Sequence, residues 1–386
     1  MNICIISARY PYKDNMEFVF VKKIVDEWAK MGHRCVVITP FPQVTYWRKR
    51  IKYKPKYYRD EVAPGIYVDV YNPRILNAQL SFKGVEQSSW AASRVVEWQI
   101  RRTGVKFDFI YCHFFRSALY GFRYAQKNNI PFFVATGESG IDPLLKPYPA
   151  FTWDAFCDHT KGVIAVSGKN KTEAAQMGYI VESKCKVFPN GTDTSLFRPS
   201  EKASCRAELG LPQAAFIVAC VGFICERKGQ NRLLEAVRKL NDDGVKLLFV
   251  GAAAPIETFP LEGEEIVFKG TVNNTELPAY LCSSDVFCLP TRAEGCCNAI
   301  IEALACGLPI VSSNLPFNWD LLDGSNSIMV NPDNIDEIAA AIRCIKDNEE
   351  IRKELSEGAL KTAQRLDIHQ RAKDILEYIG QRIKSK

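Results

Sequence analysis

The sequence lacks several features that would assign it to a simple class. No apolar run approaches the ~18 residues of a membrane-spanning helix, which argues against an integral membrane protein. There is no C-x-x-C pair, and the four histidines lie far apart, so a zinc site has little support. No G-x-G-x-x-G follows the first expected strand, Ile3–Ser7, which argues against a nicotinamide-dependent dehydrogenase. With 386 residues, of which 47% are apolar, the chain is long enough for two domains with sizeable cores.

Cysteine is abundant but does not form the pattern of a disulfide framework. The 14 cysteines are scattered from Cys4 to Cys344, mostly inside apolar, strand-like segments. This pattern predicts reduced core thiols in a cytoplasmic protein. Residues 1–6 form an expected strand without a basic leader or a secretory cleavage site, so we expect the mature protein to start at this strand.

The net charge of +6 is concentrated in one place. Residues 41–60, here called the basic aromatic segment, hold seven basic residues and one acid, and the remaining 43 basic and 43 acidic residues balance. Lysine and arginine interleaved with tyrosine and tryptophan suit an anionic membrane surface or the acceptor side of an enzyme. A solvated connecting loop is the alternative, and no RNA-binding module accompanies the segment, so we expect no nucleic-acid partner. The residues predicted to contact the membrane or acceptor are Arg48, Lys49, Arg50, Lys52 and Lys54.

Short β-rich runs alternate with helical patterns along nearly the whole chain, which predicts parallel sheets covered by helices. We expect two Rossmann-like, doubly wound α/β domains facing a cleft, over residues 1–196 and 197–366, and a C-terminal helix over 367–386 that packs back on the first domain. Ligands of such sheets bind beyond the carboxyl ends of the strands. The expected strands are Ile3–Ser7, Cys35–Thr39, Phe109–His113, Phe132–Thr136, Gly162–Ser167, Lys186–Pro189, Phe216–Gly222, Lys246–Gly251, Ile266–Gly270, Val286–Pro290, Pro309–Ser313 and Ile328–Asn331.

The most informative stretch is residues 289–311, LPTRAEGCCNAIIEALACGLPIV. It predicts a strand that ends at Pro290, a loop, and a helix from about Asn298 to Ala305. Free N–H groups at the start of this helix favour an anion, so Gly295, Cys296, Cys297 and Asn298 are candidates for a phosphate site. Glu294 can reach sugar hydroxyls, and Glu302 can accept hydrogen bonds from a ribose diol. The alternative is an ordinary βα unit with one solvated and one half-buried glutamate.

A second loop carries basic residues after the expected strand Phe216–Gly222. Arg227 and Lys228 can neutralise a diphosphate, and Gly229 allows a tight turn into a helix. A solvated basic turn is the alternative. Gly222 and Thr271, each at the end of an expected strand, complete the candidate donor-binding residues of this half.

The pattern E-G-x-x-N-x-x-x-E-A-x-A-C-G-x-P-I-V at 294–311 resembles the signature of the retaining family 4 glycosyltransferases, which have the two-domain GT-B fold. Other segments agree in order: residues 162–167 with Lys171, the V-F-P-N-G-T-D stretch at 187–193, and V-G at 221–222 leading to R-K-G at 227–229. The resemblance implies a nucleotide diphosphate sugar as donor, with uridine the commonest base, and a glycan or lipid-linked acceptor in cell-surface polysaccharide synthesis. It also implies that no metal or other cofactor is needed, that Asn190 lines the donor site, and that the enzyme works in the cytoplasm at the inner face of the membrane.

The chain departs from the family pattern at three places. Phe223 stands where a basic residue usually follows the glycine, the loop Ala8–Phe18 contains no glycine, and Glu138 stands where the family often has histidine. Glu138 is therefore a candidate to accept hydrogen bonds from substrate, or else a turn residue between two glycines. Two alternative functions stay open: a non-catalytic relative that binds nucleotide sugar or glycan, and a nucleotide-sugar epimerase of the same fold. His113, at the end of a strand, is expected to be structural.

Overall fold

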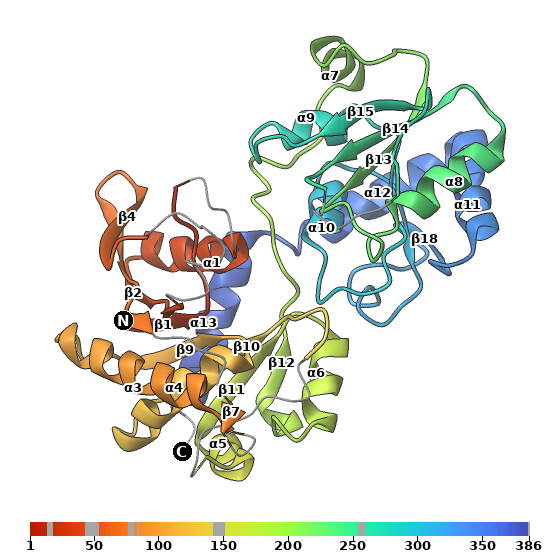
Figure 1. The fold of residues 1–386 in the computed structure, drawn as a ribbon. Helices are drawn as coiled ribbons and strands as arrows, with labels where there is room; N and C mark the ends of the chain where they lie inside the picture. Colours follow the sequence, from red (N-terminus) through yellow and green to blue (C-terminus); the bar gives the residue numbers. More distant parts are fainter. Residues whose placement is uncertain are drawn as a thin grey trace. The chain divides into compact units, whose positions relative to one another are not determined.

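The computed structural model describes residues 1–13, 18–42, 54–75, 81–82, 85–141, 151–253 and 259–384. The chain divides into two compact units, which Figure 1 shows as a ribbon. The N-terminal unit holds residues 1–188 and 371–386, and the C-terminal unit holds residues 189–370. None of the helices in this described part is both long and apolar enough to cross a membrane.

The N-terminal unit is built on an eight-stranded sheet in the order β12-β11-β10-β9-β1-β2-β5-β4. All neighbours pair in parallel except β4 and β5, which form an antiparallel hairpin at one edge. The strand order reverses at β1 and β9, so the switch point of the sheet lies between them. The strands are β1 (Asn2–Ser7), β2 (Arg34–Ile38), β4 (Tyr57–Ala63), β5 (Ile66–Tyr71), β9 (Phe109–His113), β10 (Phe132–Thr136), β11 (Thr160–Ala165) and β12 (Cys185–Val187), with the short pairs β3 (Phe41–Pro42) and β6 (Arg74–Ile75), and β7 (Ser81–Phe82) and β8 (Val85–Glu86).

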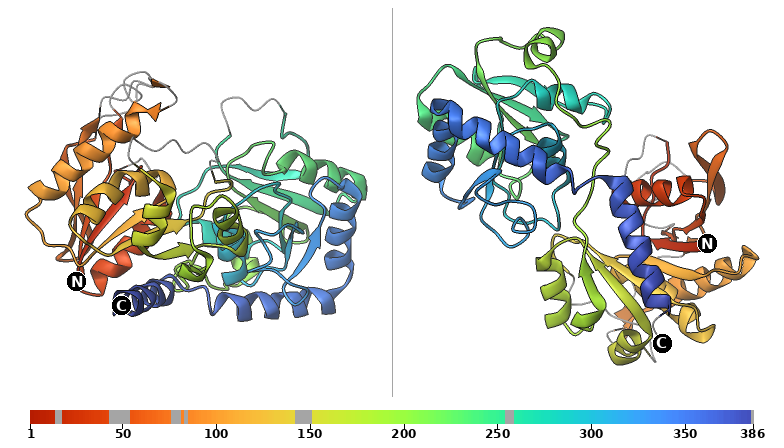
Figure 2. Two further views of the ribbon diagram at one scale, coloured as in Figure 1. Left: turned by 90° about the horizontal axis from the view of Figure 1, so that it is seen from below. Right: turned by 180° about the vertical axis from the view of Figure 1, so that it is seen from behind.

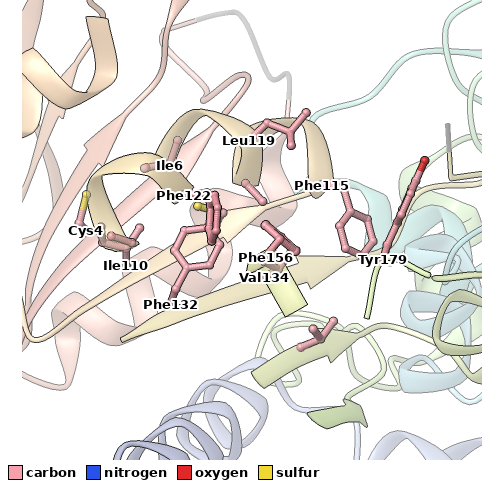
Figure 3. Close-up of a cluster of buried hydrophobic side chains, with 14 of the residues drawn as sticks. Cys4, Ile6, Ile110, Phe115, Leu119, Phe122, Phe132, Val134, Phe156 and Tyr179 are labelled. Carbon is pink, nitrogen blue, oxygen red and sulfur yellow. The ribbon is translucent and has the colours of Figure 1, made fainter. Parts of the chain in front are cut away.

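Helices cover both faces of this sheet because its central strands are apolar on both sides. Cys4 and Ile6 of β1 belong to one buried cluster, and Ile3 and Ile5 belong to another, as the alternation of a strand requires. Figure 3 shows part of the first cluster, where aromatic side chains from β10, α4 and α5 meet. The helices of the unit are α1 (Val19–Lys30), α3 (Gln87–Arg102), α4 (Phe115–Lys127), α5 (Trp153–His159), α6 (Gly168–Gln176) and α13 (Ile368–Lys384).

Helix α13 packs on the N-terminal unit although it is the last element of the chain (Figure 2). Ala372, Ile375 and Ile379 join the second apolar cluster, and the Trp28 indole N–H of α1 donates to the Ala372 carbonyl at 3.0 Å. The predicted position of the C-terminal helix is thus what the structure has.

The C-terminal unit contains a six-stranded, fully parallel sheet in the order β15-β14-β13-β16-β17-β18. Numbered within the unit this is 3-2-1-4-5-6, the Rossmann order, with its switch point between β13 and β16. Helices α8 and α11 lie side by side, as do α10 and α12 (Figure 1). The elements are β13 (Phe216–Val221), β14 (Val245–Val250), β15 (Ile266–Gly270), β16 (Val286–Leu289), β17 (Ile310–Ser313), β18 (Ser327–Val330), α7 (Lys202–Glu208), α8 (Gln230–Leu240), α9 (Leu277–Cys282), α10 (Asn298–Ala305), α11 (Ile335–Asp347) and α12 (Glu349–Ala363).

All twelve strands predicted from the sequence are present within two residues of their expected ends. The β4–β5 hairpin was not predicted, although the turn signal Pro64-Gly65 stands between two β-rich runs. All 14 cysteines are free thiols, as expected.

The division between the units differs slightly from the predicted boundaries at 196 and 366. Residues 189–196 belong to the C-terminal unit because Asn190 contacts Cys296 and Thr192 pairs with Asp367. The Thr194 hydroxyl also donates to Asp367 at 2.6 Å, which holds residues up to 370 in the same unit.

Candidate active site

The candidate site of the C-terminal unit lies where β13 and β16 end, at the switch point of the sheet. The loop after β13 carries Arg227 and Lys228, and the loop after β16 carries Glu294. The Arg292 backbone N–H donates to the Arg227 carbonyl at 2.9 Å, which ties the two loops together. The topology therefore brings together charged residues that are more than 60 positions apart in the sequence.

Glu294 is the centre of this charge cluster. One of its carboxylate oxygens, Oε1, lies 2.7 Å from an Arg227 guanidinium nitrogen and 2.8 Å from the Lys228 Nζ. The Thr291 hydroxyl donates to the same oxygen at 3.1 Å. Arg227 also donates to the Ala293 carbonyl, so the guanidinium is held against the loop by two bonds. The three charged residues predicted from the sequence thus form one connected set.

The shifted pKa values of Glu294 and Lys228 keep both groups charged at neutral pH. Burial raises the pKa of Glu294, but the nearby Lys228 and Arg227 charges and their hydrogen bonds outweigh it, and the net pKa falls below its ordinary value. Burial lowers the pKa of Lys228, yet its neighbours Cys297 and Glu294 raise it overall. Burial also raises the pKa of the Cys297 thiol, so at neutral pH the charged partner of Lys228 is Glu294.

Two glycines shape the loop after β13. Gly222 has a φ of +143°, and a Cβ there would lie 3.4 Å from the Lys228 Cε, so the lysine side chain passes over this glycine. Gly229 has a φ of +82°, and a Cβ there would lie 2.5 Å from the Pro290 carbonyl oxygen. A side chain at Gly229 would therefore push the basic loop away from the end of β16.

Helix α10 begins directly after the Glu294 loop. Its N-cap, Cys297, makes no side-chain capping hydrogen bond, and the Cys297 sulfur lies 4.0 Å from the Lys228 Nζ. The helix runs over the predicted residues Asn298–Ala305. Its N-terminus, the positive end of the helix dipole, therefore faces the loop that carries Glu294. Glu302 lies within this helix and is only 6% exposed.

Asn190 joins the same region from the start of the C-terminal unit. Its side-chain amide donates to the Cys296 carbonyl at 3.2 Å, and its backbone N–H lies 3.3 Å from the Cys296 sulfur. Gly295, Cys296 and Cys297 are buried at this point. Thr271 is exposed and directly follows β15, which is separated from β13 by β14, so the strand before it does not adjoin the charge cluster.

Phe223, at the position where the family pattern has a basic residue, is 48% exposed.

The structure also identifies a residue of this region, Arg232, that the sequence patterns did not indicate. Arg232 is buried and donates to the carbonyls of Pro290 and Pro332, at 2.8 and 2.7 Å, so it braces the end of β16 from α8. Its position four residues after Lys228 is the only signal in the sequence.

Glu138 lies in the N-terminal unit, after β10. Its carboxylate accepts hydrogen bonds from the Thr136 hydroxyl at 2.8 Å and the Gly137 backbone N–H at 2.9 Å, and the Phe115 N–H at the start of α4 also bonds to it. Burial raises its pKa, against the effect of these bonds. The Glu138 carbonyl accepts from Asn170 at 2.8 Å. These contacts favour the turn-residue interpretation over the catalytic one.

His113 is buried at the end of β9 beside the rings of Phe20 and Phe114, with ring centroids 5.2 and 4.8 Å away. Burial, with a smaller contribution from the Arg371 charge, lowers its pKa to about 3. The imidazole is therefore neutral and packed, as the sequence analysis expected.

Only part of the basic aromatic segment belongs to the described residues. Arg48, Lys49, Arg50 and Lys52 lie outside the described residues. Lys54 is buried, and its ammonium group donates to the Tyr10 carbonyl at 2.6 Å. The prediction that Lys54 contacts a membrane or acceptor is therefore wrong, because its charge is directed into the N-terminal unit.

Comparison with known proteins supports the family resemblance that the sequence motifs indicate. Residues 18–196 match the family described as Glycosyltransferase Family 4, and residues 215–348 match the family described as Glycosyl transferases group 1. The chain is 27% identical over 383 residues to a protein of Bacillus subtilis named as a putative teichuronic acid biosynthesis glycosyltransferase, TuaC, with 94% of each chain covered. Over 175 residues it is 31% identical to a GDP-mannose-dependent phosphatidylinositol monomannoside mannosyltransferase of Mycolicibacterium smegmatis, covering 40% of this chain and 45% of that one.

Solved structures share the fold at low sequence identity. A sucrose-phosphate synthase from Thermosynechococcus elongatus superposes with a TM-score of 0.75 at 18% identity, covering 98% of both chains. The Anabaena protein HepE in complex with UDP-glucose gives a TM-score of 0.70 at 19% identity, covering 99% of this chain and 100% of that one. The two-sheet GT-B architecture, the ordered motifs and the family matches agree: the chain belongs to the group 1, or family 4, glycosyltransferases.

Proposed function

We propose that this protein is a retaining glycosyltransferase that moves a sugar from a nucleoside diphosphate sugar, with UDP as the favoured nucleotide, to a glycan or lipid-linked acceptor in polysaccharide synthesis. The observation that carries the proposal is the Arg227–Lys228–Glu294 cluster at the switch point of the C-terminal sheet. A relative named for teichuronic acid biosynthesis and a neighbour that binds UDP-glucose support the acceptor and donor classes.

The departure of the nucleoside diphosphate creates negative charge on the leaving phosphate. Lys228 and Arg227 oppose that charge, and the N-terminus of α10 adds its dipole, so these groups take the place of a metal ion. Glu294 keeps both cations oriented in the absence of donor. In the complex with donor it accepts hydrogen bonds from the sugar hydroxyls. Glu302 bonds to the ribose hydroxyls.

In the retaining reaction, the bond between the anomeric carbon and the diphosphate oxygen breaks, and the acceptor oxygen bonds to the same face of that carbon. The acceptor proton passes to the leaving phosphate. No protein side chain is needed as the base, which fits the neutral, packed His113 and the hydrogen-bonded Glu138.

The proposal is tested with variants and a panel of donors. UDP-, GDP- and ADP-sugars are first compared by the shift in melting temperature, and the stabilising donor is then used to measure transfer and slow hydrolysis. We expect Lys228→Ala to lower transfer by about 100-fold or more, since lost transition-state charge stabilisation costs roughly 2.7–4 kcal/mol. Glu302→Ala is expected to abolish most transfer as well, because it removes the carboxylate that binds the ribose hydroxyls of the donor. Lys239→Ala removes an exposed lysine of α8 and serves as the matched control, expected to leave transfer unchanged. Near-normal transfer by both active-site variants would overturn the assignment.

A second candidate function is that of a non-catalytic relative that binds nucleotide sugar. It is favoured by Phe223, which is exposed where the family pattern has a basic residue, and by Glu138, whose carboxylate is already hydrogen-bonded. Such a protein would show a donor-dependent shift in melting temperature without any donor hydrolysis. An epimerase would instead convert the free donor in the absence of acceptor.

A further inference from the structure

A second concave surface lies in the N-terminal unit, between α3 and the β4–β5 hairpin. The hollow has a volume of about 590 Å³, which falls within the roughly 300–1,000 Å³ of ligand sites. Among the described residues that line it, none is acidic. Its cationic and aromatic lining consists of Lys56, Arg74, Arg94 and Arg102 with Tyr57, Tyr71 and Trp98.

Two of the cations are held in place by aromatic rings. The Arg102 guanidinium lies 4.7 Å from the centroid of the Trp98 ring, and the Arg74 guanidinium lies 4.2 Å from that of Phe41. Arg74 also donates to the Lys54 carbonyl at 2.5 Å. A cation–π contact orients a guanidinium without neutralising it, so Arg102 keeps its positive charge for a ligand.

The acidic residues of the same elements have other partners. Asp69 of β5 accepts a hydrogen bond from the Tyr57 hydroxyl at 2.9 Å, and its carboxylate lies 3.9 Å from guanidinium nitrogens of Arg34 and Arg59. Glu97 of α3 is buried and pairs with Arg101 at 2.8 Å and with Arg123 at 3.4 Å. Among the described residues, the charged side chains that line the hollow itself are therefore all basic.

Helix α3 extends this surface along one face. Trp90, Arg94, Trp98 and Arg102 follow one another at intervals of four, which places them on the same side of the helix. Trp90 and Trp98 are 48% and 52% exposed. Large aromatic side chains that remain this exposed beside arginine side chains mark a binding surface.

The chemistry of the hollow selects one class of ligand. Guanidinium groups recognise carboxylates with two parallel hydrogen bonds, and tryptophan and tyrosine offer flat apolar faces with a polar edge. A ligand that combines carboxylates with apolar ring faces satisfies both. A flat bilayer contacts protruding side chains and does not fill a concave hollow, so the shape favours a soluble ligand over a lipid surface.

We propose that this hollow binds an acidic saccharide, a glycan chain whose sugar rings carry carboxylates. The choice of a saccharide rests on the proposed function, whereas the anionic character rests on the lining itself. Arg94, Arg102 and Lys56 pair with the carboxylates, and Trp98 packs against a ring.

The test measures saccharide binding in the absence of nucleotide donor. A negative result would therefore count against this hollow and not against the proposed transfer reaction. The probe is a tetramer of galacturonic acid, compared with the neutral maltotetraose, and binding to the full chain is followed by calorimetry. We expect the acidic tetramer to bind, and the neutral one to bind at least tenfold more weakly. We expect Arg94→Glu and Trp98→Ala each to weaken binding of the acidic tetramer at least tenfold.

Two matched controls separate a site from general attraction. Lys127→Glu makes the same change in net charge on an exposed residue of α4, and Trp319→Ala removes an exposed tryptophan of the C-terminal unit. Both are expected to bind the acidic tetramer as the unmodified chain does. Equal weakening by Lys127→Glu, or no binding of the acidic tetramer at millimolar concentration, would overturn the proposal. Binding only to vesicles of phosphatidylglycerol and phosphatidylcholine would overturn it in favour of a lipid surface.

Discussion

The two sheets of this protein end in different chemistry at their switch points. Beyond β13 and β16 the C-terminal unit gathers Lys228, Arg227 and Glu294 within ion-pair distance. At the end of β9 the N-terminal unit places neutral His113 among aromatic rings, and the Glu138 carboxylate, after β10, accepts hydrogen bonds from backbone and hydroxyl donors. The same topology thus holds a charged set in one unit and a packed, neutral set in the other. The strand order determines where a site lies. The side chains of the loops determine whether that site can stabilise a charged group.

The comparison of the two carboxylates predicts the largest difference. We expect Glu294→Gln to lower kcat for transfer by about 100-fold or more, because it removes the shared partner of Lys228 and Arg227. Glu138→Gln should change kcat by less than about threefold and instead lower the free energy of unfolding by about 1–2 kcal/mol, as hydrogen bonds to the carboxylate weaken. For both variants, steady-state kinetics measures kcat and urea unfolding measures the free energy of unfolding. An equal loss of kcat in the two would place Glu138 in the chemistry and remove the contrast.

We expect an effect of intermediate size from His113, on the pH dependence of the free energy of unfolding. Its pKa is about 3 in the folded protein, against an ordinary value of about 6.5. The unfolded chain therefore takes up a proton first as the pH falls, and the folded state loses about 2 kcal/mol between pH 7 and pH 5 through this residue. This contribution is complete above the unfolded pKa and declines steadily down to about pH 3.

Replacing His113 by Phe should remove this part of the pH dependence, since the phenyl ring suits a site beside Phe20 and Phe114. Urea unfolding at pH 7 and pH 5 measures it, with exposed His369→Phe as the control. An unchanged pH dependence in His113→Phe would show that the histidine titrates normally and that its surroundings are not dry.

The smallest effect is expected at the exposed edge of the charged region. Arg292 pairs with Asp333 at 2.7 Å and with Glu226 at 2.9 Å, but all three side chains are substantially exposed. Surface ion pairs contribute about 0–1 kcal/mol, so Arg292→Ala should lower the free energy of unfolding by less than about 1 kcal/mol. Transfer should stay within about twofold. A loss of transfer as large as that of Glu294→Gln would extend the functional cluster outward to this exposed network.

Much of the fold followed from local patterns. The apolar runs predicted every strand of the six-stranded sheet, and the Asn298–Ala305 helix was predicted with its observed ends. The β4–β5 hairpin was missed because β4 is half exposed, rich in charge and begins within the basic aromatic segment, so the partner that β5 needs was read as a loop. Lys54 was misassigned for the same reason: its charge suggested the surface, whereas a hydrogen bond to the Tyr10 carbonyl holds it inside.

The sequence by itself determined the fold class, the family and the identity of the charged residues, because strand periodicity and motif order are local properties of the chain. Only the tertiary structure decided that one Glu294 oxygen serves both Lys228 and Arg227, that Glu138 is bound at the start of α4, and that Arg94 and Trp98 share a hollow with Lys56. Each of these depends on contacts between segments distant in the sequence. The parallel topology creates such contacts by bringing the ends of separate strands to one edge of a sheet, and no local pattern records them.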